Sequence, residues 1–177
     1  MQGKRATKYL VQASTLAALT AVLAQIQLVI GPVPVSLAVL GAYLAGMLLP
    51  PLWAAVSMLV YVALGLVGIP VFAAFQGGPA VLFGKTGGYL LGYICIAWLT
   101  AFAVQHNKPW LTAAGMAAGL LACYALGTAW FMAVTGTGLA QSLVWCVWPF
   151  VVPDLCKAVC AYGLGQLLRR RLAKAGL

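Results

Sequence analysis

Residues 149–157 read PFVVPDLCK and contain Asp154, the only acidic residue in a chain of 177 residues. Lys157 follows three positions later, so on a helix the two side chains share a face. A charge at the centre of a membrane helix costs about 2.5–3.5 kcal/mol on insertion scales. An acid retained at such a cost indicates a functional site, and the alternative is an ion pair that only steadies the start of a helix.

The composition around this stretch decides the class of protein. The chain is 64% hydrophobic and 6% charged, whereas soluble domains carry about 25% charged residues. Its mean hydropathy is +1.04. A soluble fold of this size could not bury so much apolar surface, so we predict an all-α integral membrane protein with a single domain, residues 1–177.

Apolar stretches separated by proline and glycine clusters predict six membrane helices. A full span needs about 20 apolar residues, and some of these stretches are shorter. The predicted helices are 9–30, 37–49, 52–68, 87–104, 110–134 and a last one from about 153 to the 169–171 arginine run.

The connections between these helices differ in character. Prolines on both sides of Val33 predict a loop at 31–36, and a further loop follows Thr135 and continues through Trp148. The connection 69–86 is rich in glycine and proline but also apolar. We expect it to fold back onto the bundle as a lid or a wall of a binding site.

Basic residues are distributed unevenly between the two sides of the predicted bundle. With six helices both termini share a side, and that side carries Lys4, Arg5, Lys8, Lys108, Arg169, Arg170, Arg171 and Lys174. The positive-inside rule therefore places both termini in the cytoplasm. The net charge of +9 reflects this topology, and no basic groove for nucleic acid is indicated.

The remaining charges, Lys85, Asp154 and Lys157, fall in the outer half of the bundle and predict an outward-facing site. Two ammonium groups and one carboxylate favour an anionic ligand that also offers N–H donors to Asp154, and an aromatic lining favours an apolar body. For each aromatic residue, a place in the membrane-interface belt is the alternative. The candidate lining residues are Phe72, Phe75, Tyr89, Trp145 and Trp148.

Small residues form two stripes at helical spacing, which lets helices approach closely. One stripe is Gly84, Gly88 and Gly92 at the start of the fourth helix. The other is Ala13, Ala17 and Ala21 in the first helix. For the alanines, packing inside the chain and docking of a separate membrane subunit are equally compatible with the sequence.

Enzymatic chemistry is poorly supported. The segment from Gly78 to Thr86 has five residues between its glycines, one more than a phosphate loop needs. The single His106 and the single Asp154 lie on opposite predicted sides of the membrane, so they cannot form a catalytic triad or a metal site. We predict no enzyme activity, no metal and no cofactor.

Four segments together resemble a known family. They are VPVSL at 33–37, GIPVFA at 68–73, GKTGGYLLG at 84–92 and PDLCK at 153–157. In this order they look like the BioY family, the biotin-specific substrate-binding (S) subunits of energy-coupling factor (ECF) transporters. The resemblance covers nearly the whole chain, and the last two segments are its more specific parts.

The resemblance implies an ECF S-component-like bundle in the bacterial inner membrane that binds biotin with high affinity from the outer side, as a transported ligand. The implied partners are a transmembrane coupling subunit, which the alanine stripe would contact, and a pair of ATPases; a homo-oligomer is also compatible. Carried over by position, Asp154, Lys157, Lys85, Tyr89 and Gln76 are expected to bind biotin. The full set of expected ligand-binding residues also includes Phe75, Gly88 and Trp148. The alternatives are another small carboxylated vitamin as ligand, or a structural membrane subunit without one.

Overall fold

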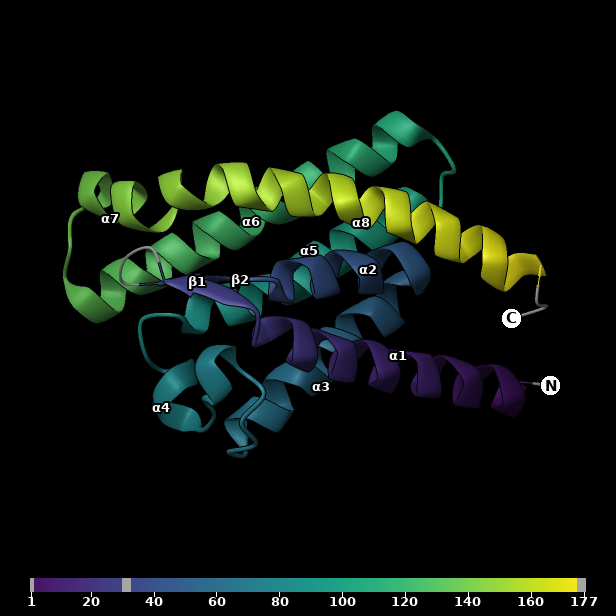
Figure 1. Cartoon of the computed structure of the whole chain (residues 1–177), viewed down its shortest axis with the longest axis horizontal. Coiled ribbons are helices and arrows are strands. Elements are labelled where there is room, and N and C mark those ends of the chain that lie inside the picture. The colour runs from purple at the N-terminus through teal and green to yellow at the C-terminus, as the bar shows by residue number, and fades with distance from the viewer. Residues whose placement is uncertain (1, 30–32, 175–177) are drawn as a thin grey trace.

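Long helices run side by side between two ends of the structure that differ in character (Figure 1). The computed structural model describes residues 2–29 and 33–174. Both termini lie at one end, where α1 begins and α8 ends, and we call this the terminal end. The short helices α4 (Pro79–Leu82) and α7 (Leu139–Cys146) lie at the opposite end, the loop end (Figure 1).

Most of the predicted helices are present with nearly the predicted bounds. The fourth, 87–104, has the predicted bounds, and the second, third and fifth differ by one or two residues at each end. The remaining elements in chain order are α1 (Gln2–Ala24), β1 (Gln27–Val29), β2 (Pro34–Ser36), α2 (Ala38–Leu48), α3 (Pro51–Leu66), the 3₁₀ helix η1 (Ala73–Phe75), α5 (Gly87–Val104), α6 (Pro109–Thr135) and α8 (Trp148–Lys174).

The first helix lies closer to the N-terminus than predicted. It ends at Ala24, and the chain after it forms a β-hairpin in which Leu28 of β1 lies opposite Val35 of β2. The predicted loop at 31–36 is thus partly strand, and its first residues, 31 and 32, lie outside the described residues. Strands of three residues are too short for an alternating pattern to reveal them.

The last helix begins before the predicted position. It starts at Trp148 and includes Pro153 in its interior, whereas proline was expected in its first turn. A proline removes one helical hydrogen bond, and membrane helices tolerate it where neighbouring groups satisfy the freed carbonyl. The predicted loop before this helix also contains α7.

Within the described residues, three helices are long and apolar enough to cross a membrane: α5, α6 and residues Trp148–Leu172 of α8. Helices α2 and α3 are apolar but shorter, and 11 residues of α2 extend only about 16 Å. The chain is therefore an integral membrane protein. Six spans and cytoplasmic termini remain predictions.

Helices α5 and α6 pack closely because glycines remove side chains from their interface. A Cβ built at Gly88 would lie 2.6 Å from the carbonyl oxygen of Leu126, and one at Gly92 would lie 2.8 Å from the Cα of Cys123. From α6, Gly119 approaches the backbone of Ile96 in the same way. The predicted close approach is thus confirmed for Gly88 and Gly92.

The alanine stripe of α1 faces the interior of the bundle. Ala13 and Ala17 are each 1% exposed, and the Ser57 hydroxyl of α3 donates a hydrogen bond of 2.8 Å to the Ala13 carbonyl. Ala21 is half-buried. In this structure Ala13 and Ala17 pack within the chain, which is one of the two alternatives that the sequence left open. The contact with a partner subunit stays a prediction.

We expect Gly92→Ala to lower the free energy of unfolding by roughly 1–3 kcal/mol, because overpacking forces α5 and α6 apart. Gly163→Ala on α8 is the matched control, since nothing lies within 4 Å of a Cβ there. The control should be neutral or stabilising by up to about 1 kcal/mol. Melting of the purified protein in detergent measures both, and equal melting temperatures would contradict close packing at Gly92.

Candidate ligand-binding site

A buried ion pair forms the centre of the candidate site. The Lys157 Nζ lies 2.7 Å from Asp154 Oδ1, and the Tyr124 hydroxyl of α6 donates a hydrogen bond of 2.8 Å to Asp154 Oδ2. Asp154 is 1% exposed and Lys157 is 7% exposed. Both carboxylate oxygens are therefore held by donors from two different helices, which compensates for the loss of water.

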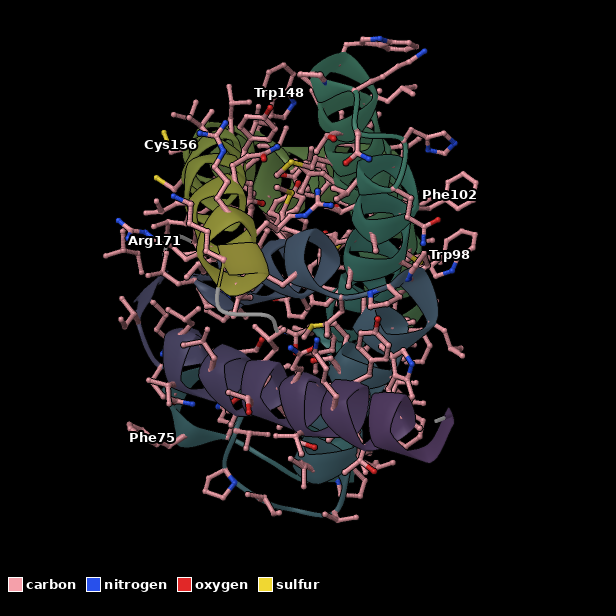
Figure 2. All side chains as sticks on the ribbon, turned by 90° about the vertical axis from the view of Figure 1, so that its right-hand side faces the viewer. Phe75, Trp98, Phe102, Trp148, Cys156 and Arg171 are labelled. Carbon is pink, nitrogen blue, oxygen red and sulfur yellow. The ribbon has the colours of Figure 1, made fainter. Side chains whose placement is uncertain are left out.

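The helical spacing of this pair turns it inward. Asp154 and Lys157 lie three residues apart on α8 and share its buried face. Their neighbours Leu155 and Cys156 are exposed on the opposite face, and Figure 2 shows Cys156 pointing away from the bundle. The apolar sequence around the pair thus provides the lipid-facing surface of α8.

Two neighbouring cavities share five lining residues, and one of the two lies beside the ion pair. A small one of about 20 Å³ reaches Asp154 and Lys157, and a larger one of about 270 Å³ lies toward the connection between α3 and α5. The larger cavity is near the lower limit of small-molecule pockets, roughly 300–1,000 Å³. The residues that line both are Val33, Pro34, Ser36, Tyr89 and Tyr93.

Tyr89 is a fixed wall between these cavities. Its hydroxyl donates a hydrogen bond of 3.2 Å to the Cys146 carbonyl at the end of α7, and its ring stacks on Phe150 with 6.3 Å between centroids. Gly127 of α6 lies directly behind the ring, where any side chain would collide with it. Tyr89 therefore presents a rigid aromatic surface beside Asp154.

The connection 69–86 folds back onto the bundle and supplies a wall of the larger cavity, as predicted. Phe72 is buried against Tyr61, with ring centroids 5.6 Å apart in an edge-to-face arrangement, and it lies over Gly65, where a side chain would overlap its ring. Ala73, Gln76 and other residues of the connection then line the cavity.

Gln25, just after α1, fastens this wall to the bundle. Its Nε2 donates to the carbonyls of Ala21 at 2.9 Å, Val71 at 3.3 Å and Phe72 at 3.2 Å. Its Oε1 accepts a bond of 2.8 Å from the backbone N–H of Phe75. Ala74 and Phe75 have φ of 59° and 55°, a conformation that costs free energy unless the surroundings enforce it.

Gln27 offers a free acceptor to the site. It lines the larger cavity, and its Oε1 is buried with no hydrogen-bond partner among the described residues. Such an unpaired atom costs about 1–3 kcal/mol, and a ligand N–H would satisfy it. Sequence analysis missed both Gln25 and Gln27, because amides near a helix end usually indicate only the approach to a loop.

The structure brings together four of the eight expected ligand-binding residues. Asp154, Lys157, Tyr89 and Gln76 line the two cavities. The other four do not line either cavity. Lys85 is exposed and lines neither cavity, Gly88 packs against α6, and Phe75 and Trp148 are each 71% exposed and point away from the bundle (Figure 2).

The charged groups that line the cavities form one pair. They are the Asp154 carboxylate and the Lys157 ammonium group, so the lining of the two cavities is neutral overall. Aromatic rings from Tyr61, Tyr89 and Tyr93 line the rest. This arrangement suits a small ligand with an apolar body and a polar group that can both donate to Asp154 and accept from Lys157.

Comparison with known proteins assigns the family. A family model described as the BioY family matches residues 1–174. The chain belongs to the BioY family. A probable biotin transporter BioY of Pyrococcus horikoshii is 41% identical over 152 residues, which cover 86% of this chain and 90% of that protein. Biotin transporter BioY2 of Lactococcus lactis is 33% identical over 159 residues, which cover 89% of this chain and 87% of that protein.

A solved structure has the same BioY fold. It is the crystal structure of the S-component for biotin from an ECF-type ABC transporter, with a TM-score of 0.85 and 25% sequence identity. The similarity covers 96% of this chain and 95% of that one. The resemblance of the four sequence segments to BioY proteins is therefore confirmed.

We expect Lys157→Met to destabilise this BioY-family chain by about 3–5 kcal/mol, because it leaves the Asp154 carboxylate buried without its cation. The double variant Asp154→Leu/Lys157→Met removes both charges and should recover most of that loss. Thermal unfolding of the ligand-free protein measures the difference. A double variant no more stable than Lys157→Met would show that the two charges do not act as a pair.

We expect Gln25→Leu to release the cavity wall. The backbone amide of Phe75 would lose its acceptor, and its hydrogen exchange should accelerate by roughly tenfold or more. Hydrogen-exchange mass spectrometry of peptides covering 71–76 measures this. Gln12→Leu, within α1 and closer to the terminal end, is the control and should leave these peptides unchanged. Equal exchange in both variants would contradict the role of Gln25.

Proposed function

We propose that this chain is a biotin-binding S component of an ECF-type vitamin transporter, and not an enzyme. The observation that carries the proposal is the buried Asp154–Lys157 pair beside a cavity with aromatic walls. Support comes from membership of the BioY family, from relatives named biotin transporters, and from the fold shared with an S-component for biotin.

The ion pair supplies both kinds of polar group that the ureido ring of biotin needs. An ionised carboxylate has about four acceptor positions, and Lys157 and Tyr124 occupy two of them. Asp154 can thus accept a ureido N–H without breaking the pair. Lys157 retains ammonium donors for the ureido oxygen or the carboxylate of the ligand.

The rest of the ligand is accommodated by the two neighbouring cavities. Tyr89 stands between them as an apolar surface, and Gln76 and Gln27 line the larger one. In this proposal the Gln27 Oε1, which is buried without a partner among the described residues, accepts a hydrogen bond from the ligand. The aromatic side chains pack against the apolar ring and chain of biotin.

The transport cycle in this proposal uses six spans, cytoplasmic termini and entry of biotin from the outer side. Basic residues concentrate at the terminal end, where the positive-inside rule predicts cytoplasm. The site lies toward the loop end, which is the outer side in this proposal. Energy for uptake comes from a transmembrane coupling subunit and ATPase subunits in the cell membrane, because the chain has no nucleotide-binding loop of its own.

We expect Asp154→Asn to weaken biotin binding by about 10- to 150-fold, since hydrogen bonds to a charged group contribute about 1.5–3 kcal/mol. Lys85→Gln should bind as the wild type does, because Lys85 lines neither cavity. Equilibrium binding of labelled biotin to detergent-purified protein measures both effects.

Two outcomes would overturn the proposal. If the wild-type protein binds another carboxylated vitamin and not biotin, the site is a ligand-binding site but biotin is not its ligand. Absence of a thermal shift with any vitamin would indicate a structural subunit, since a ligand at 100 times its dissociation constant adds about 2.7 kcal/mol of stability.

A further inference from the structure

A second, unrelated hollow lies on the lipid-facing side, between α6 and α8. Helix α6 packs mainly on α5, and α8 packs mainly on α2, so these two helices leave a groove where they diverge toward the terminal end in the view of Figure 1. This α6–α8 groove has a volume of about 450 Å³ and is lined by α6 from Pro109 to Leu120 and by α8 from Leu155 to Tyr162.

The α6–α8 groove is almost wholly apolar and has a firm floor. Tyr43 of α2 closes its bottom, and the Tyr43 hydroxyl donates a hydrogen bond of 3.2 Å to the Met116 carbonyl. This bond uses the polar atom that could otherwise face the groove. What remains for an occupant is a surface of methyl and methylene groups and aromatic rings.

A basic pocket continues the groove at the terminal end. This pocket of about 330 Å³ is lined by Lys108 from the turn before α6 and by Arg169 and Arg170 near the end of α8. Pro109 lines both the pocket and the groove. The apolar groove and the cluster of three cations therefore adjoin each other at Pro109.

These three cations have no carboxylate side chain to pair with. Asp154 is the only acidic residue in the sequence, and it is already bound to Lys157. Arg169 follows Asp154 by fifteen residues on α8, a separation of about 22 Å along the helix. A counter-ion for the basic pocket must therefore come from outside the side chains of this protein.

The length of the groove matches one leaflet of a membrane. Pro109 and Leu120 are eleven residues apart on α6, which corresponds to about 16 Å along the axis. Half of a hydrocarbon core about 30 Å thick is about 15 Å. The groove is therefore long enough to extend across one leaflet, from the headgroup level to the middle of the bilayer.

We propose that the α6–α8 groove and the basic pocket together bind an anionic phospholipid of the leaflet at the terminal end. The acyl chain lies in the groove over Tyr43, and the phosphate lies among Lys108, Arg169 and Arg170. Basic pockets between membrane helices are known to recognise anionic lipid headgroups. The bound lipid fills the space between α6 and α8, the two helices that hold Tyr124 and Asp154.

Native mass spectrometry of the full chain, titrated with phosphatidylglycerol or phosphatidylcholine, tests this proposal. Phosphatidylglycerol should bind more tightly. R169Q/R170Q should weaken its binding by about 30-fold, since each basic residue near an anionic surface contributes about fivefold. R171Q is the matched control and should bind as the wild type does, because Arg171 lines neither cavity and points away from α6 (Figure 2).

The groove is tested separately from the charges. Ala113 and Ala117 line it, whereas Ala118 is exposed on the same helix and does not. Ala117→Trp should abolish tight binding of phosphatidylglycerol, and Ala118→Trp should not. Binding of labelled biotin to R169Q/R170Q and to Ala117→Trp reports whether the variants are folded.

Four results would overturn the proposal. Equal affinity for the two lipids, or equal losses in R171Q and R169Q/R170Q, would indicate diffuse attraction to the surface. Competition by inorganic phosphate as strong as by the lipid would identify a site for free anions. If the wild-type chain forms dimers and Ala117→Trp dissociates them, the groove is a contact site for a second copy of the chain and not for a lipid.

Discussion

The burial of one carboxylate constrains much of this structure. Asp154 can remain charged in an apolar bundle only if donors replace water, and these come from Lys157 on its own helix and Tyr124 on α6. The bond to Tyr124 joins α8 to α6 at this level. The β-hairpin then covers the pair, with Ser36 and Val33 over the small cavity. Without the Asp154 carboxylate, Lys157 and the Tyr124 hydroxyl would lose the acceptor that they share.

Helix α5 makes the cavity compatible with close packing. One face of α5 carries Gly88 and Gly92, which bring the helix against α6. The face toward the hairpin carries Tyr89 and Tyr93, which line both cavities. Close contact on one side and large rings on the other leave a walled space between rigid elements, where a ligand loses little free energy to rearrangement of the protein.

The sequence predicted the features that depend on composition and on helical spacing. It did not predict the features that depend on where a side chain points in the folded chain. Long apolar runs and the spacing of Asp154 and Lys157 sufficed for the helices and for the ion pair. Lys85 was grouped with this pair but lines neither cavity, because counting charges by side of the membrane says nothing about where a side chain points. The hairpin was missed because three-residue strands have no readable pattern. The hydrogen bonds from Gln25 to the cavity wall were missed because their partners are backbone groups 46 to 50 residues away in the sequence.

The attachment of Gln25 has a mechanical consequence. One amide side chain, just beyond the end of α1, carries every described side-chain hydrogen bond between that region and residues 71–75. Gln25 follows the last residue of α1 directly and also bonds to the Ala21 carbonyl of that helix. The end of α1 and the wall of the larger cavity are therefore tethered to each other through a single side chain.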